Sequence, residues 1–196
     1  MAEEQAGFRT GRRTMDQIFV IRQLSEKFIE KNRTLYNNFV DYQQAFDSVW
    51  QSGLWQVLRN YGIPEKLVTL LEDIHSKTLS AVRVDGELTE WFQVTVGVRQ
   101  ECNLSPYLFN LTMEAMMIQA LKNVDIGVKV SSQLISNLRF TDGIDLIAES
   151  QEGLQHLTDK VNESSKRLGL KINTKKRKTM AISENHVARG YGHYSE

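Results

Sequence analysis

The sequence predicts an α+β domain, and three observations lead to this fold class. Short strand-like runs alternate with amphipathic helical segments along the 196 residues. Two of these runs, Leu138–Phe140 and Ile144–Ala148, meet at Asp142-Gly143, and Asp-Gly between such runs is a strong hairpin signal. Hydrophobic residues (41%) and charged residues (24%) occur in proportions usual for a globular domain with one core. We therefore expect a central antiparallel hairpin with helices packed around it.

The first part of the chain predicts a helix, a strand and two further helices. Thr14 and Gln17 have the spacing of a capping box, which predicts a helix over 15–31. Phe39 and Val40 lead into Asp41, so a strand is expected to end with this acid at its tip. Apolar residues at helical spacing then predict two helices: Leu54, Val57, Leu58 and Tyr61, ended by Gly62, and Leu67, Leu70, Leu71 and Ile74, begun by Pro64.

The second part predicts strands around a long helix. Runs over 81–84 and 91–96 flank Asp85-Gly86, which indicates a hairpin or two edge strands. Ser105-Pro106 is typical of a helix start, with Leu108, Phe109, Leu111, Met116, Met117, Ala120 and Leu121 as its buried side. Ser150 is expected to cap a helix that ends at Gly169, followed by short strands over 170–173 and 179–182.

Charge and cysteine content restrict the classes of protein. Lys plus Arg (24) equals Asp plus Glu (24), a balance that argues against a strongly basic nucleic-acid-binding domain. Basic residues nevertheless cluster over 166–178 and at Arg9, Arg12 and Arg13. Cys102 is the only cysteine, so an internal disulfide is excluded and an intracellular, reducing compartment is expected. No apolar run reaches the length of a membrane span, and no secretory signal is expected.

Asp41 and Asp142 are the candidate metal ligands. A carboxylate at a rigid turn between buried strands can bind a divalent ion, but a second acid is needed, and Asp41 is the best candidate for it. The plain alternative is that Asp142 is an ordinary turn residue and Asp41 a strand-end or capping residue. Without further information the plain alternative is favoured.

Several motifs in order resemble those of a reverse transcriptase of the non-LTR (LINE-type) retrotransposon branch. They are Gln5-Ala-Gly7-Phe8-Arg9, Phe39-Val-Asp41-Tyr-Gln-Gln-Ala-Phe46-Asp47, Tyr61-Gly-Ile-Pro64, Gly97-Val-Arg-Gln100, Leu104-Ser-Pro106, Phe140-Thr-Asp142 and Gly169-Leu-Lys-Ile-Asn173. Together they span nearly the whole chain. With this resemblance, metal binding by Asp41 and Asp142 becomes the favoured interpretation.

The resemblance implies a palm-type antiparallel sheet backed by helices, with a fingers lobe and no thumb. The reverse-transcriptase-like part covers 1–182, and 183–196 is a C-terminal tail. In such a division the fingers comprise about 1–35 and 78–105, and the palm about 36–77 and 106–182.

The resemblance also implies roles for single residues. Asp41 and Asp142 match the acids that hold catalytic Mg²⁺ or Mn²⁺, and RNA template, DNA primer and deoxynucleotides are the implied partners. Arg9, Phe46, Gln100 and Lys176 match positions that contact nucleotide or nucleic acid. For Phe46 a core aromatic is an equal alternative, and for Arg9, Gln100 and Lys176 the alternative is solvated surface.

Departures from the family pattern predict an impaired enzyme. Gly143 stands where the family has another acid, Glu101 replaces a glycine and Asn103 a proline. Asp145 lies too far along the strand to replace the missing acid, because two residues span roughly 6–7 Å. The expected function is therefore a weak or inactive RNA-directed DNA polymerase. The alternatives are a non-catalytic nucleic-acid-binding or interaction protein and an unstable relic without a selected role.

Overall fold

The core of the protein is a four-stranded antiparallel sheet in the order β10-β1-β9-β8. The computed structural model describes residues 2–99 and 102–184. The strands are β1 (Leu35–Val40), β8 (Asn137–Phe140), β9 (Gly143–Ala148) and β10 (Lys178–Ile182). β1 lies between β9 and β10, with Val40 opposite Ile144 and Leu35 opposite Ile182. The predicted α+β class and the central hairpin are confirmed.

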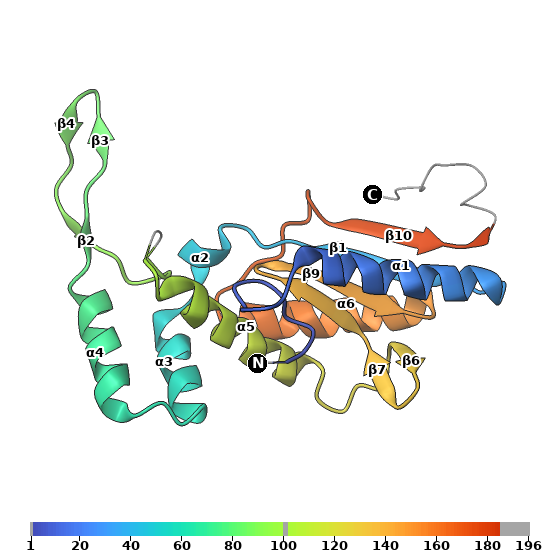
Figure 1. Cartoon of the computed structure of the whole chain (residues 1–196). Coiled ribbons are helices and arrows are strands. Elements are labelled where there is room, and N and C mark those ends of the chain that lie inside the picture. The colour runs from blue at the N-terminus through green and yellow to red at the C-terminus, as the bar shows by residue number, and fades with distance from the viewer. Residues whose placement is uncertain (1, 100–101, 185–196) are drawn as a thin grey trace.

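Helices cover both faces of this sheet (Figure 1). α5 (Ser105–Ala120) and α6 (Gln151–Lys166) pack on the face that carries Leu146 and Ala148. α1 (Thr14–Glu30) covers the opposite face, where its Leu24 and Phe28 join a second apolar cluster with strand residues such as Ile147. The strands alternate between these two clusters, as expected for a sheet that is buried on both sides.

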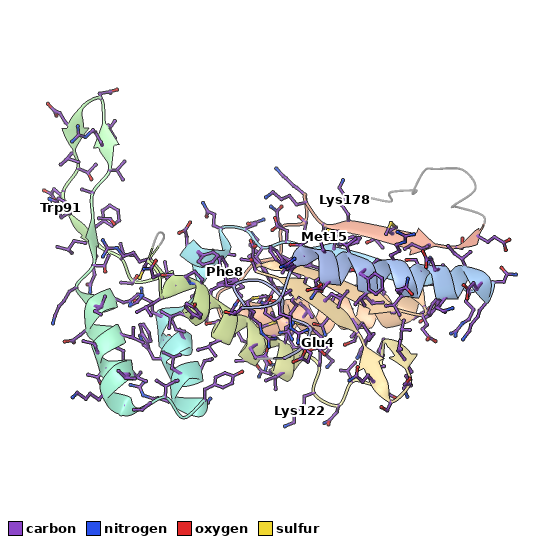
Figure 2. The ribbon with its side chains drawn as sticks, in the orientation of Figure 1. Glu4, Phe8, Met15, Trp91, Lys122 and Lys178 are labelled. Atoms are coloured by element: carbon purple, nitrogen blue, oxygen red, sulfur yellow. The ribbon has the colours of Figure 1, made fainter. Side chains whose placement is uncertain are left out.

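The segment between β1 and α5 forms a second region, whose Leu54, Leu58 and Val68 join the same apolar cluster as the sheet. It contains α2 (Ala45–Ser48), α3 (Gln51–Asn60) and α4 (Glu65–Ser76). An arm follows, made of β2 (Leu79–Ser80) paired with β5 (Phe92–Gln93) and β3 (Arg83–Val84) paired with β4 (Glu87–Leu88). The arm stands clear of the body, with Trp91 exposed along it (Figures 1 and 2).

Local sequence patterns predicted most helices and strands correctly, but several of their ends differ in the structure. α1 begins one residue early, because the carboxylate of Asp16 accepts a hydrogen bond from the Arg13 amide, so the predicted Thr14–Gln17 box is wrong. Ser150 caps α6 as predicted, with its hydroxyl accepting from the Gly153 amide. The strand predicted over 91–96 is reduced to Phe92–Gln93, and that over 170–173 to one bridge between Ile172 and Tyr42.

Of the four apolar residues whose spacing predicted α4, only Leu71 packs against the core. Leu67, Leu70 and Ile74 are about half exposed, whereas Val68 and His75 are buried. The cause is tertiary, because α4 packs against α3, where the His75 ring meets the Trp55 ring at 5.1 Å. The structure also contains a small hairpin that no signal predicted, β6 (Val128–Val130) with β7 (Gln133–Ile135).

Candidate active site

Asp41 and Asp142 lie at the same edge of the sheet. Asp41 directly follows β1, and Asp142 lies in the two-residue turn that joins β8 to β9. Because Val40 pairs with Ile144 on the neighbouring strand, the residue after Val40 comes level with Gly143. The fold thus brings together two acids that are distant in the sequence.

The two carboxyl groups interact electrostatically. Burial raises the pKa of Asp142 above its ordinary value, and the charge of Asp41 raises it further. A backbone hydrogen bond within the turn and the ammonium group of Lys176 act in the opposite direction. The arrangement is therefore a half-buried pair of like charges with one cation beside it.

One carboxylate oxygen of Asp41, Oδ2, is positioned to contact a cation. Asp41 Oδ2 is shielded from solvent and accepts no hydrogen bond from any residue that the structure describes. Nζ of Lys176 lies 3.1 Å from this oxygen, outside hydrogen-bonding geometry, so the contact is electrostatic. Hard divalent ions such as Mg²⁺ prefer carboxylate oxygens, so Asp41 and Asp142 are a suitable donor set, with the Lys176 ammonium group beside the Asp41 oxygen.

Gly143 occupies a position that would accept an acidic side chain. Its φ is not positive, and a Cβ atom there would meet only the carbonyl oxygen of Phe140, at an ordinary 3.4 Å. The positive φ of the turn falls on Thr141, at 59°, a costly conformation for a β-branched residue. The backbone therefore does not require glycine at 143, although Asp-Gly was the signal that predicted the hairpin.

Asp145 lines the same pocket as Asp41 but is held by a different partner. Its side chain is buried beneath α1, and its Oδ2 accepts a hydrogen bond of 2.8 Å from the Asn37 amide. Burial raises the pKa of Asp145 to about 7, and the hydrogen bond from Asn37 opposes this shift.

Across residues 2–99 and 102–184 there is no group of three acidic, histidine or cysteine side chains that could hold a metal ion.

Arg9 and Phe46 line one cleft of about 950 Å³ beside the sheet edge. The Phe46 ring stacks on Phe109 with centroids 4.5 Å apart, so it belongs to the core and also borders the cleft. Arg9 donates to the backbone oxygens of Ala2 and Gln5. Its guanidinium group is thus partly occupied within the protein, and Arg12 in the same cleft pairs with Glu3.

The other predicted contacts fall in different places. Lys176 lies against Asp41 rather than in the cleft that holds Arg9. Gln100 and Glu101 lie outside the described residues. Gly97 comes so close to the backbone of Asp47 that a Cβ atom would be 2.8 Å from its carbonyl oxygen. This close approach places the Gly97 motif next to the segment that follows Asp41.

Sequence reasoning missed the polar network that supports the turn. Residues 4–6 add to the edge of β8, where the Ala6 amide donates to the Arg139 carbonyl and the Arg139 amide to the Glu4 carbonyl. The buried Gln5 amide donates to Asn110 Oδ1 at 3.2 Å and reaches the Thr141 carbonyl at 3.5 Å. Only the Gln5-Ala-Gly7-Phe8 motif could have indicated that this segment matters.

The fold resembles that of solved telomerase structures. A telomerase from Candida tropicalis in complex with a fragment of telomeric RNA matches 90% of this chain and 30% of its own chain, with a TM-score of 0.67 and 17% identity. At this identity the likeness concerns the fold alone. No helix in the described parts of the chain is long and apolar enough to cross a membrane.

The chain belongs to the reverse transcriptase (RNA-dependent DNA polymerase) family, whose pattern matches residues 1–191. It is 34% identical over 150 residues to the Pol polyprotein of the retrotransposable element R2DM of Drosophila melanogaster, covering 76% of this chain and 14% of the relative. It is 27% identical over 178 residues to the polymerase of the mobile element jockey of Drosophila funebris, covering 88% and 19%. The chain thus spans less than a fifth of these two relatives, and the predicted family is confirmed.

Proposed function

We propose that this domain is the nucleotide-adding core of an RNA-directed DNA polymerase from a non-LTR retrotransposon, weakened by the loss of one acid. The observation that carries the proposal is the pair Asp41 and Asp142, on adjacent strand ends, with a buried Asp41 oxygen that accepts no hydrogen bond and lies 3.1 Å from the Lys176 ammonium group. In this proposal the two acids hold Mg²⁺ or Mn²⁺. Such ions stabilise the attacking 3′ oxygen and the departing pyrophosphate in nucleotide addition.

The same proposal assigns the surrounding surfaces. The sheet with α5 and α6 acts as the palm, and the arm with the N-terminal segment as the fingers. The cleft lined by Arg9 and Phe46 receives the incoming deoxynucleotide next to primer and RNA template. Gln100 would contact this nucleotide by its place in the motif. Lys176 supplies a positive charge beside Asp41 at the same edge of the sheet.

The reduced polymerase activity in this proposal follows from the missing negative charge at position 143. With Gly143 in place of an acid, the site has two carboxylates where the family pattern has a third. Loss of one member of a group that acts as a unit can remove most of the rate. Because the Gly143 backbone tolerates a side chain, Gly143→Asp is expected to restore a ligand without disturbing the turn.

Primer extension on an RNA template with Mn²⁺ and deoxynucleotides tests the proposal. The starting protein should extend weakly, Gly143→Asp should extend at least about tenfold faster, and Gly143→Asp with Asp142→Asn should be inactive. Gly143→Asn is the matched control, since it adds similar volume without charge. Equal extension by all four proteins, or none by Gly143→Asp, would contradict the assignment.

A non-catalytic nucleic-acid-binding role is the second candidate, favoured by the missing acid and the basic stretch over 166–178. RNA binding that weakens with salt and persists in the double variant Asp41→Asn, Asp142→Asn, without extension by Gly143→Asp, would support it. The pairing of Arg12 with Glu3 and of Arg167 with Glu163 removes part of the free positive charge that such binding needs.

A further inference from the structure

The geometry points to Lys176 as a cation of the chain itself that contacts Asp41 at the proposed metal site and competes with the divalent ion for this residue. This inference rests on the proposed function, because it concerns the same pair of acids. It adds a property of this chain's own side chains, namely that ion binding must displace an ammonium group.

The backbone fixes Lys176 next to Asp41. The Asn173 amide donates to the Asp41 carbonyl oxygen at 2.8 Å, so the segment that carries Lys176 is attached to the same residue that its side chain contacts. The amides of Lys176 and Arg177 both donate back to the Asn173 carbonyl, which closes a tight turn. The backbone of Lys176 is therefore held near Asp41, within reach of its side chain.

The charge balance explains why a cation is held there. Asp41 and Asp142 carry like charges at the same edge of the sheet, and the ammonium group of Lys176 lies 3.1 Å from Asp41 Oδ2. The pocket on the α1 side of the sheet, about 360 Å³, is lined by Asp41, Lys176 and the buried Asp145. A divalent ion that approaches Asp41 Oδ2 would meet the ammonium group at the oxygen it needs.

The contact is weak enough to be displaced. The Lys176 side chain is 70% exposed, and exposed ion pairs contribute little because solvent screens them. A divalent ion interacts with the two acids through twice the charge, so it can replace the ammonium group at a cost in affinity. Lys176 thus raises the ion concentration at which the edge is filled.

Mn²⁺ titration of the purified chain, followed by the electron paramagnetic resonance signal of the free ion, tests this inference without using activity. Lys176→Met should bind Mn²⁺ roughly fivefold more tightly than the starting protein. Lys176→Arg keeps the charge and should stay close to the starting value. Lys175→Met is the matched control, because Lys175 is exposed in the same turn and forms no ion pair with the described residues.

The outcomes separate the inference from the proposed function. If Asp41→Asn and Asp142→Asn abolish Mn²⁺ binding but Lys176→Met binds no more tightly than Lys175→Met, the competition by Lys176 is refuted and the metal site stands. If Mn²⁺ binding is absent, or is insensitive to both Asp substitutions, the metal site and the inference fall together. Unchanged thermal unfolding of Lys176→Met shows that the comparison is made on folded protein.

Discussion

Gly7 and Thr141 are packed so tightly that a Cβ atom on Gly7 would lie 2.3 Å from the Thr141 backbone nitrogen. Thr141 is the residue before Asp142 and carries the positive φ of the turn. The N-terminal segment therefore presses directly on the backbone that presents a candidate metal ligand. Close approach, and not a left-handed conformation, is what requires glycine at position 7.

Gly7→Ala should destabilise the fold and displace the turn. Overpacking against backbone atoms costs about 1–3 kcal/mol, because the neighbouring chain must move. Urea unfolding measures this loss, and Mn²⁺ affinity should fall with it. Gly143→Ala, in the same turn but with its nearest contact at 3.4 Å, is the control and should change stability little. Equal effects of the two substitutions would show that the contact between Gly7 and Thr141 is unimportant.

Asn110→Leu should weaken the support of the turn from the other side. Asn110 donates to the Gly7 carbonyl and accepts from Gln5, so its loss leaves the buried Gly7 carbonyl without this donor and Gln5 with only its longer contact to the Thr141 carbonyl. The expected cost is about 1–3 kcal/mol in urea unfolding. Thr112→Val is the control on the same helix, since its buried hydroxyl donates only to the helix carbonyl of Leu108. A cost no greater than that of Thr112→Val would refute a supporting role.

Asp145 should make stability decrease as pH rises from about 4 to about 7. The folded pKa is about 7 against an ordinary 3.8, so the folded state binds more protons in this range and loses stability as the carboxyl ionises. The full loss is on the order of 4 kcal/mol, from three pKa units.

Asp145→Asn should remove this dependence and be the more stable protein at pH 8, since an amide oxygen can still accept from Asn37. The difference between the urea unfolding free energies of the two proteins across pH 4–8 isolates this group from others that titrate. A difference that stays constant with pH would disprove the raised pKa.

Arg139 and Glu114 form a buried ion pair whose members depend on one another. Arg139 Nη1 donates to Glu114 Oε2 at 3.1 Å, and both side chains are less than a tenth exposed. Arg139→Met should cost about 3–5 kcal/mol, because it leaves a buried carboxylate unpaired. Adding Glu114→Leu should recover most of that loss in a double-mutant cycle. Additive losses would indicate that each residue acts through other contacts.

Local signals in the sequence were sufficient for most of the fold. The hairpin around Asp142, the strand that ends at Asp41 and the Ser150 cap depend on neighbouring residues, and the structure has all three. The buried side of α4 depends on which helix packs against it, and periodicity does not contain that information. Residues 4–6 pair with Arg139 across more than 130 positions, through a single bridge without local pattern.

The candidate site was predictable to a different degree for each residue. Asp41 and Asp142 follow from ordered motifs, and strand pairing explains why they meet. The expected contact of Lys176 with nucleic acid stays a prediction, and its contact with Asp41 was not foreseen, because it depends on the turn from Asn173 that attaches to the Asp41 carbonyl. The supporting roles of Gln5 and Asn110 could not be predicted from their residue type, because their side-chain amides act here through tertiary hydrogen bonds.

The order of strands in the sheet determines when this domain can fold during synthesis. β1 begins at Leu35, yet its outer neighbour β10 ends only at Ile182, so the sheet stays incomplete until almost the whole domain has left the ribosome. Pairings between such distant segments close slowly. A nascent chain that stalls before β10 would leave one edge of β1 bare, and a bare edge recruits strands from other chains, so interrupted translation should yield aggregates.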